Sequence, residues 1–254
     1  MKKNSAVNVF WTGGWDSTFR ILQLLITKKK TVQPYYILDP DRKSITAEFN
    51  AMKAIKQAVF QMYPYTNELL RPTIIRNLVE MDNDQNLFRD LEQIAKSYSL
   101  GSQYSWQAYY CNEIGVNDME LSTQKPGSTY ELVSKESLFI KEEDSAYYIM
   151  DKHSKQVNLY TLLHYFRFPL LEHTKLDMFQ EALECGFEDI LELSWFCHRP
   201  IRGKMACGTC RPCRIVLEQG LGRRVSFLGH IRYYLFIKTG LNKLRTILLN
   251  RKKI

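Results

Sequence analysis

The sequence predicts an α/β protein built on a doubly wound parallel sheet, with a four-cysteine zinc site near its C-terminal end. Short apolar runs rich in β-forming residues alternate with longer segments of helical periodicity, a pattern typical of parallel sheets covered by helices. A glycine turn joins the first such run to the first helix, and four of the six cysteines lie between residues 197 and 213. The 254 residues, 45% of them hydrophobic, are sufficient for a packed core.

The turn between the first strand and the first helix is expected to bind an anion. Residues 7–11 are apolar and β-forming, and residues 19–25 have the apolar side of a helix. Between them lie Gly13 and Gly14, which allow unusual backbone angles, and three residues that commonly cap a helix: Asp16, Ser17 and Thr18. Such a turn directs unpaired backbone N–H groups toward one point. The turn has neither the Walker A pattern nor the dinucleotide-binding pattern.

The alternation of strands and helices continues after this turn. Residues 32–38 predict a second strand, followed by the charged loop 39–43 at its carboxyl end, where ligands gather in open α/β sheets. A helix is predicted over residues 44–63, ending before Pro64. The next expected elements are a short strand near residues 73–75, helices over 86–98 and 104–114 with Gly115 as a left-handed cap, and a short strand over 118–122.

Residues 123–160 are expected to form an insertion or lid, because they are turn-rich and too short for a core of their own. Two β-prone runs, 146–150 and 156–160, predict a hairpin around the sequence DKHSK. The sheet is expected to resume over residues 166–171. A helix is then predicted over residues 174–185, with Thr174 or His173 as its cap and Gly186 at its end.

The clustered cysteines have the spacing C-x9-C-x2-C-x2-C, at Cys197, Cys207, Cys210 and Cys213. Two cysteines separated by two residues can direct both sulfurs at one ion, and four thiolates in a tetrahedral arrangement suit structural Zn²⁺. An iron–sulfur cluster and free or redox-active thiols are the alternatives. Because a closed four-ligand site leaves no open position, we expect a structural rather than a catalytic role.

Positive charge is concentrated at the C-terminal end. The chain has a formal net charge of +8, and residues 219–254 contain nine Lys and Arg but no Asp or Glu. We therefore expect a domain over residues 1–220 and a basic, helical extension over 221–254, broken at Gly240. This extension would pack on the body or on a second subunit, or bind RNA, an acidic protein or a membrane surface. With no visible signal peptide or apolar run of roughly 20 residues, we expect a cytoplasmic protein without a membrane span.

The run from Thr12 to Ser17, TGGWDS, resembles the S-G-G-x-D-S pyrophosphate loop of the N-type ATP pyrophosphatases, or PP-loop superfamily. Residues 207–214, CGTCRPCR, and the run 168–187 complete a resemblance to the 7-cyano-7-deazaguanine synthase family of the queuosine pathway. The similarity covers most of residues 6–220 and implies an adenine nucleotide alpha hydrolase-like fold. The loop 39–43 departs from the family's motif, which leaves the acceptor substrate open.

The resemblance implies an ATP-dependent ligase that adenylates a deazapurine carboxylate and releases pyrophosphate. Ammonia or another amine would then form an amide, which a second ATP converts to a nitrile in the family. Asp16 would help to hold Mg²⁺, and the nucleotide would lie on Thr12, Gly13, Gly14, Asp16, Ser17 and Thr18. Positive charge that aligns and neutralises the phosphates is expected from Lys175 and Arg42, which with Asp16 and Ser17 are the catalytic candidates.

Two other functions stay open. An RNA-modifying PP-loop pyrophosphatase would adenylate a tRNA base before sulfur or amine transfer. The basic extension favours this function, whereas the absence of a recognisable RNA-binding domain argues against it. A nucleotide-binding module without turnover is the third hypothesis, and the intact glycine turn argues against it.

Overall fold

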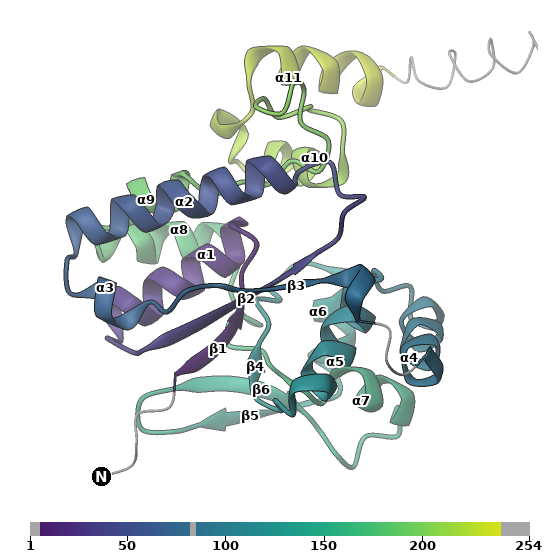
Figure 1. The fold of residues 1–254 in the computed structure, drawn as a ribbon. Helices are drawn as coiled ribbons and strands as arrows, with labels where there is room; N and C mark the ends of the chain where they lie inside the picture. Colours follow the sequence, from purple (N-terminus) through teal and green to yellow (C-terminus); the bar gives the residue numbers. More distant parts are fainter. Residues whose placement is uncertain (1–5, 82–84, 240–254) are drawn as a thin grey trace, which may run out of the picture.

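The computed structural model describes residues 6–81 and 85–239, so the predicted helix break at Gly240 and the residues after it lie outside the described range. At the centre is a five-stranded parallel sheet in the order β3-β2-β1-β4-β7, of which β1 to β4 are labelled in Figure 1. Its strands are β1 (Val7–Phe10), β2 (Val32–Leu38), β3 (Ile74–Asn77), β4 (Met119–Glu120) and β7 (Phe166–Arg167). The parallel α/β sheet predicted from the sequence is therefore confirmed.

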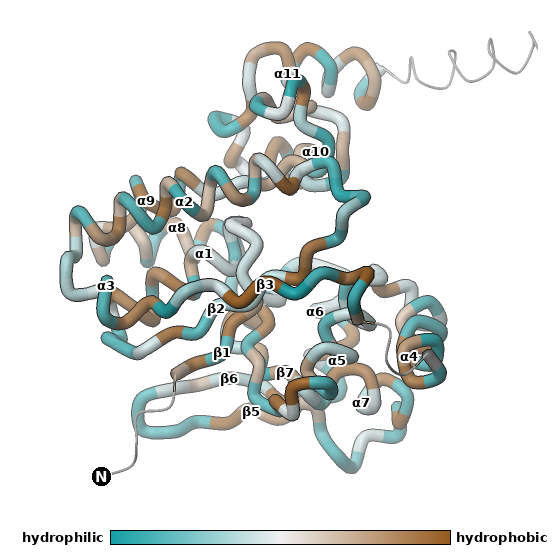
Figure 2. Tube along the Cα trace, in the orientation of Figure 1, coloured by the Kyte–Doolittle hydropathy of each residue, from teal (hydrophilic) through white to brown (hydrophobic). Residues whose placement is uncertain are grey.

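Helices cover both faces of the sheet, and neighbouring strand residues point to opposite faces. Val9 and Tyr36 belong to one core cluster, whereas Phe10 and Tyr35 belong to the other. The first cluster includes residues of α1 (Trp15–Leu22), its continuation η1 (Gln23–Thr27), α2 (Ile45–Met62), α8 (Lys175–Glu184) and α9 (Glu188–Glu192). The second includes residues of α4 (Gln85–Ser97), α5 (Gln103–Ile114) and α7 (Val157–Leu163). Hydrophobic and hydrophilic residues alternate along these helices (Figure 2), as expected for helices with one buried side.

The central strand, β1, lies where the direction of winding reverses. Val9 of β1 aligns with Pro34 of β2 on one side and with Glu120 of β4 on the other. The chain passes from β1 to β2 and β3, and returns to the other side of β1 only at β4. In open α/β sheets such a reversal leaves a crevice at the carboxyl ends of the strands. The glycine turn follows β1 at this point.

Helix caps agree with the predictions except at α1. Thr174 caps α8 and forms a capping box with Asp177, and Gly115 and Gly186 adopt left-handed conformations with φ of 66° and 74°. The N-cap of α1 is Gly14, with no side-chain hydrogen bond, so the prediction that Asp16, Ser17 or Thr18 caps this helix is wrong. These three residues lie inside the helix, because it begins one residue after the glycines.

The predicted hairpin around DKHSK is also wrong in its second strand. Strand β6 (Ala146–Met150) pairs in antiparallel fashion with the preceding β5 (Ser137–Lys141), and the run predicted as the second strand forms α7 instead. In α7 the buried residues are Leu159, Leu162 and Leu163, whose spacing is helical. Packing of this face in the second core cluster overrides the local β propensity.

The segment expected as an insertion or lid is built into the body. Tyr148 of β6 exchanges backbone hydrogen bonds of 3.2 and 2.9 Å with Phe168, just after β7. Met150, Leu159 and Leu162 are buried in the second core cluster. The same segment contains α6 (Ser128–Val133), while α3 (Thr66–Leu69) and η2 (Leu78–Glu80) flank β3.

The chain after α9 packs across the predicted domain boundary at residue 220. It forms α10 (Arg211–Glu218), η3 (Gly222–Arg224), α11 (Phe227–Tyr233) and η4 (Tyr234–Lys238). Leu221 and Val225 are buried in the first core cluster together with Cys213. The described part of the basic extension is thus helical, and its first turn belongs to the core. Within the described ranges, no helix combines the length and the apolar character needed to cross a membrane.

Candidate functional site

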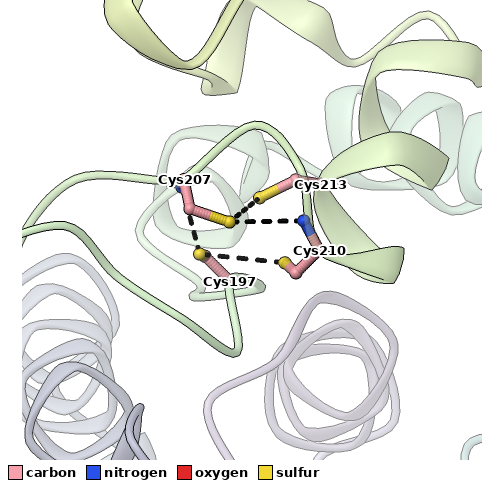
Figure 3. Close-up of side chains that lie close together, drawn as sticks. All are labelled: Cys197, Cys207, Cys210 and Cys213. Carbon is pink, nitrogen blue, oxygen red and sulfur yellow. Dashed lines mark hydrogen bonds between the residues drawn. The ribbon is translucent and has the colours of Figure 1, made fainter. Parts of the chain in front are cut away.

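The structure brings the four predicted metal ligands together (Figure 3). The Sγ atoms of Cys197, Cys207, Cys210 and Cys213 all lie within 4.8 Å of one another. The Sγ atoms of Cys207 and Cys213 are 3.8 Å apart, and those of Cys210 and Cys197 are 3.9 Å apart. Four sulfurs at about 2.3 Å from a tetrahedral Zn²⁺ are roughly 3.8 Å from each other. The cluster could therefore hold a metal ion such as zinc.

The backbone around the cysteines is arranged to support thiolate ligands. The N–H of Cys207 donates to Cys197 Sγ at 3.2 Å, and the N–H groups of Thr209 and Cys210 donate to Cys207 Sγ at 3.4 and 3.3 Å. Such donors stabilise negative charge on sulfur and orient the ligands. All four cysteines are free of disulfide bonds.

The turn that carries Cys207 and Cys210 is tied to the C-terminal helix. Gly208 has φ of 75°, and a Cβ atom there would lie 1.9 Å from the carbonyl oxygen of Gly229 in α11. Arg232 Nε donates to the carbonyl oxygen of Cys207 at 3.1 Å. The close backbone approach requires glycine at position 208, and it joins the cysteine cluster to the extension.

A cavity of about 280 Å³ lies between the glycine turn and the cysteine segment. Five residues that the sequence singled out line it: Thr12, Gly14, Asp16, Arg42 and Lys175. Other lining residues come from α2, α5, the loop before α6 and the cysteine segment, among them Glu48, Gln103, Gln124, Phe196 and His198. Segments that are far apart in the sequence thus converge on the carboxyl end of β1.

Gly13 and Gly14 hold the turn in a shape that other residues resist. Gly13 has φ of 69°, and a Cβ atom at this position would lie 3.0 Å from Met52 Cγ and 3.1 Å from the carbonyl oxygen of Glu48. The carbonyl oxygen of Gly13 accepts a hydrogen bond of 2.7 Å from the N–H of Trp195. The turn is therefore clamped between α2 and the segment that leads to the cysteines.

The first turn of α1 presents N–H groups without intrahelical acceptors. The first intrahelical bond runs from Thr18 N to Gly14 O at 2.9 Å. Helix geometry therefore leaves the N–H groups of Trp15, Asp16 and Ser17 without partners inside the helix. Ser17 Oγ donates to the carbonyl oxygen of Gly14 at 3.4 Å, and no side chain caps α1. An uncapped helix N-terminus beside a cavity suits an anionic ligand.

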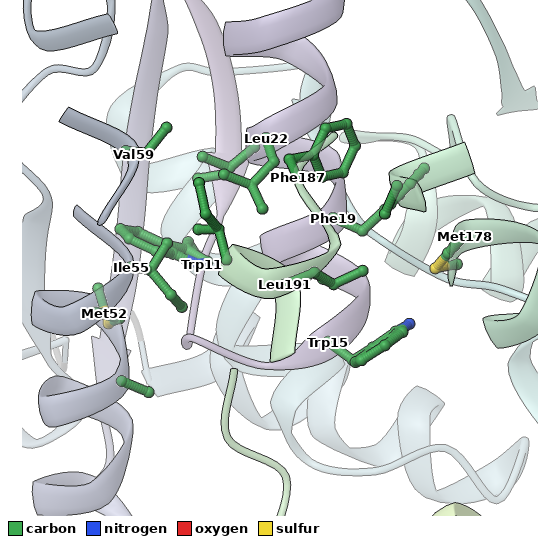
Figure 4. Close-up of a cluster of buried hydrophobic side chains, with 14 of the residues drawn as sticks. Trp11, Trp15, Phe19, Leu22, Met52, Ile55, Val59, Met178, Phe187 and Leu191 are labelled. Atoms are coloured by element: carbon green, nitrogen blue, oxygen red, sulfur yellow. The ribbon is translucent and has the colours of Figure 1, made fainter. Parts of the chain in front are cut away.

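Thr18 lies away from the cavity. Its side chain is fully buried, and its Oγ1 accepts a 3.0 Å hydrogen bond from the indole N–H of Trp11, which lies in the first core cluster (Figure 4). Its backbone N–H is used within α1. Thr18, one of the residues expected to contact a nucleotide, therefore supports the turn from its buried side. Gly13 and Ser17, two other residues of that set, also lie outside the cavity lining.

Two ion pairs place the predicted charges in the cavity wall. Lys175 Nζ donates to Asp16 Oδ1 at 2.5 Å, joining the first turn of α8 to that of α1. Arg42 Nη1 lies 3.4 Å from both carboxylate oxygens of Glu48, which also accepts hydrogen bonds of 2.7 Å from Tyr36 and Ser44. Burial, reinforced by the Glu48 carboxylate, raises the pKa of Tyr36, so its hydroxyl stays a donor to Glu48.

Sequence reasoning missed Arg224, which lines the cavity. Its guanidinium carbon lies 4.6 Å from the ring centroid of Trp15 and 5.0 Å from that of Phe196. Its Nε lies 3.1 Å from Glu192 Oε2, and burial lowers its pKa to about 10. Nothing in the local sequence separates Arg224 from the other basic residues of the extension, because its burial depends on the packing of α1 and residues 192–196.

His198 is a second lining residue that carried no motif. It directly follows Cys197 and lies beside Arg42 in the cavity lining. Burial, followed by the nearby positive charge of Arg42, lowers the pKa of His198 below its ordinary value.

No protein-family model matches the chain, and no curated protein matches it significantly.

Proposed function

We propose that the protein is an ATP-dependent enzyme of the PP-loop type, related to 7-cyano-7-deazaguanine synthases, that adenylates a carboxylate and releases pyrophosphate. One observation carries this proposal. The uncapped N-terminus of α1, which follows the TGGWDS turn, lies at the same cavity as Lys175 and Arg42. A polyphosphate needs such a combination of backbone donors and positive side chains.

The chain's own residues would act mainly by binding and alignment. The N–H groups of Trp15 and Asp16 would hold phosphate oxygens, and Thr12 lies in the same cavity lining. Lys175 and Arg42 would neutralise charge that develops on the phosphates in the transition state. Both cations have a carboxylate partner, which keeps them in position before the substrate binds.

The proposed reaction has two steps. A carboxylate oxygen of a deazapurine substrate attacks the α-phosphorus of ATP, the bond to the bridging oxygen breaks, and pyrophosphate leaves. Ammonia or another amine then attacks the acyl carbon, the bond from this carbon to the AMP oxygen breaks, and the nitrogen loses a proton to give an amide. For a nitrile, the amide oxygen would attack the α-phosphorus of a second ATP and pyrophosphate would leave; the bond from carbon to the AMP oxygen would then break as the nitrogen loses its protons.

Two metals fit the residues present. Asp16 offers a carboxylate oxygen in the cavity, the ligand type that Mg²⁺ prefers next to phosphates, and Mg²⁺ would supply charge neutralisation there. The four cysteines suit Zn²⁺ by their sulfur separations and their backbone donors. This zinc would hold the wall formed by His198, Pro212 and Val216, and would take no part in the chemistry.

The test is an incubation of the full chain with Mg²⁺-ATP, 7-carboxy-7-deazaguanine and ammonia, followed by mass spectrometry. AMP, pyrophosphate and the deazapurine amide or nitrile are the expected products. Release of AMP only when tRNA replaces the deazapurine would favour the RNA-modifying alternative instead. If neither acceptor yields AMP, the proposed reaction is wrong.

A further inference from the structure

Two donors in the cavity wall have no acceptor among the described residues. They are Arg224 Nη1 and Trp15 Nε1, both buried, and both residues line the cavity. The guanidinium of Arg224 stacks on the Trp15 ring at 4.6 Å, so the two donors belong to neighbouring groups. Buried donors without acceptors are rare in native proteins, because each loses its water without compensation. Because both residues line the cavity, a ligand bound there can supply the missing acceptors.

The rest of the Arg224 guanidinium is held in place. Its Nε lies 3.1 Å from Glu192 Oε2, and its Nη2 donates to Ser194 Oγ at 2.8 Å and to the carbonyl oxygen of Ser194. The rings of Trp15 and Phe196 contact the guanidinium at 4.6 and 5.0 Å. A planar group fixed on these sides presents its remaining edge in one direction.

Local charge favours an anion as that ligand. The Glu192 carboxylate is shared by Arg224 and Arg223, and the Asp16 carboxylate, which also acts on Arg224, is paired with Lys175. Phe196, Ile215 and Val216 line the same cavity and provide apolar surface. An incompletely balanced cation in such surroundings attracts negative charge more strongly than it would in water.

We propose that Arg224 and Trp15 form a recognition pair for one anionic oxygen group of the ligand, either a carboxylate or a phosphate. This pair extends the cavity's binding chemistry from the turn after β1 to the C-terminal segment. The choice of these two ligands rests on the proposed function, because that function requires two anions, a carboxylate acceptor and a nucleotide phosphate.

Binding measurements without turnover test the pair. Isothermal titration calorimetry of the full chain would use inorganic pyrophosphate, 7-carboxy-7-deazaguanine and, as a neutral ligand control, the corresponding 7-carboxamide. Arg224→Gln is expected to lower the affinity for one of the two anionic ligands by about tenfold or more, and to leave the affinity for the carboxamide nearly unchanged. Trp15→Phe keeps a ring against Arg224 but removes the N–H. It should lower the affinity for the same ligand about threefold to tenfold. The ligand affected shows whether the pair binds carboxylate or phosphate.

Arg223→Gln is the matched control variant. Arg223 also contacts Glu192, but it does not line the cavity, so its loss should leave the affinities unchanged. Thermal unfolding and zinc content would show that each variant is folded, and Trp15→Phe decides the outcome if Arg224→Gln does not fold. Wild-type affinity in both variants, an equal loss for the carboxamide, or no binding of either anion by the wild type would overturn the proposal. If the protein forms no AMP but still binds an anion in a way that depends on Arg224, the proposed reaction is rejected and the recognition pair stands.

Discussion

Lys175 Nζ lies 2.5 Å from Asp16 Oδ1, although 159 residues separate the two in the sequence. Lys175 is the first residue of α8, and a positive charge at a helix N-terminus is unfavourable for the helix itself. Its side chain is only 11% exposed, and Asp16 gives it a partner beside the cavity. This placement, which costs local helix stability, is consistent with a lysine retained to contact a ligand.

Removing the Asp16 carboxylate should abolish most of the proposed adenylating activity without unfolding the protein. We expect Asp16→Asn to reduce AMP formation at least about 100-fold, because it removes a carboxylate ligand and releases Lys175 from its position. Steady-state assays of AMP release would measure this. Asp189→Asn, an exposed acidic residue of α9, is the control and should leave the rate unchanged. Equal activity of both variants would mean that Asp16 has no role in the reaction.

A methyl group at Gly13 should destabilise the turn and the fold. The alanine would adopt a left-handed φ and crowd Met52 and the Glu48 carbonyl, so Gly13→Ala should cost about 2–4 kcal/mol in unfolding free energy. Gly115→Ala is the matched control, since its φ is 66° but nothing lies within 4 Å of the added Cβ. It should cost about 1 kcal/mol. Urea unfolding of both variants would separate crowding from backbone strain, and equal losses would contradict the crowding at Gly13.

Metal binding should depend on the clustered cysteines alone. Cys210→Ser is expected to lower the zinc content well below one ion per chain and to reduce the thermal unfolding midpoint, because the site would lose one of its four thiolates. Elemental analysis and thermal unfolding with and without a strong chelator would measure both effects. Cys185→Ser, which changes a cysteine outside the cluster, should retain the metal and the response to the chelator. Iron in place of zinc in the wild type would favour the iron–sulfur alternative.

The buried ion pair of Arg20 and Glu120 should contribute to stability only as an intact pair. Two hydrogen bonds of 2.7 Å join Arg20 to Glu120, and the side chains are 4% and 5% exposed. Glu120→Gln leaves the guanidinium charge buried without its counterion, and should cost about 3–5 kcal/mol. Glu92→Gln, which breaks the exposed pair with Lys96, should cost less than about 0.5 kcal/mol. Chemical unfolding of the two variants would test this contrast.

Periodicity was a sufficient guide to the elements that lie in the core, and insufficient where packing chose between conformations. Strand β2 and helices α2, α5 and α8 lie within a residue or two of their predicted ranges, because their apolar residues repeat with a clear period. The run at residues 156–160 was mistaken for a strand, since it is short and its helical face is completed only by Leu162 and Leu163. The cap of α1 was misplaced because local preference favours Asp16, Ser17 and Thr18 as caps, whereas the helix begins directly after Gly14.

The basic extension shows how composition alone can mislead. Arg223 and Arg224 contact Glu192, and Arg232 contacts the carbonyl of Cys207, so these three cations serve the body of the protein. The formal charge of the extension includes these three residues, although their partners lie outside the extension. Any binding of an acidic partner by the extension would have to depend on its other basic residues.

By itself, the sequence determined the parallel α/β sheet, the glycine turn after β1 and the four cysteines near the C-terminus. These are local signals, since strand and helix periods, paired glycines and cysteine spacing act over a few residues. Only the tertiary structure decided that Lys175 meets Asp16, that Thr18 lies behind the turn, and that Arg224 lines the same cavity. Those relationships depend on which helices pack against which face of the sheet, and long-range packing leaves no periodic trace in the chain.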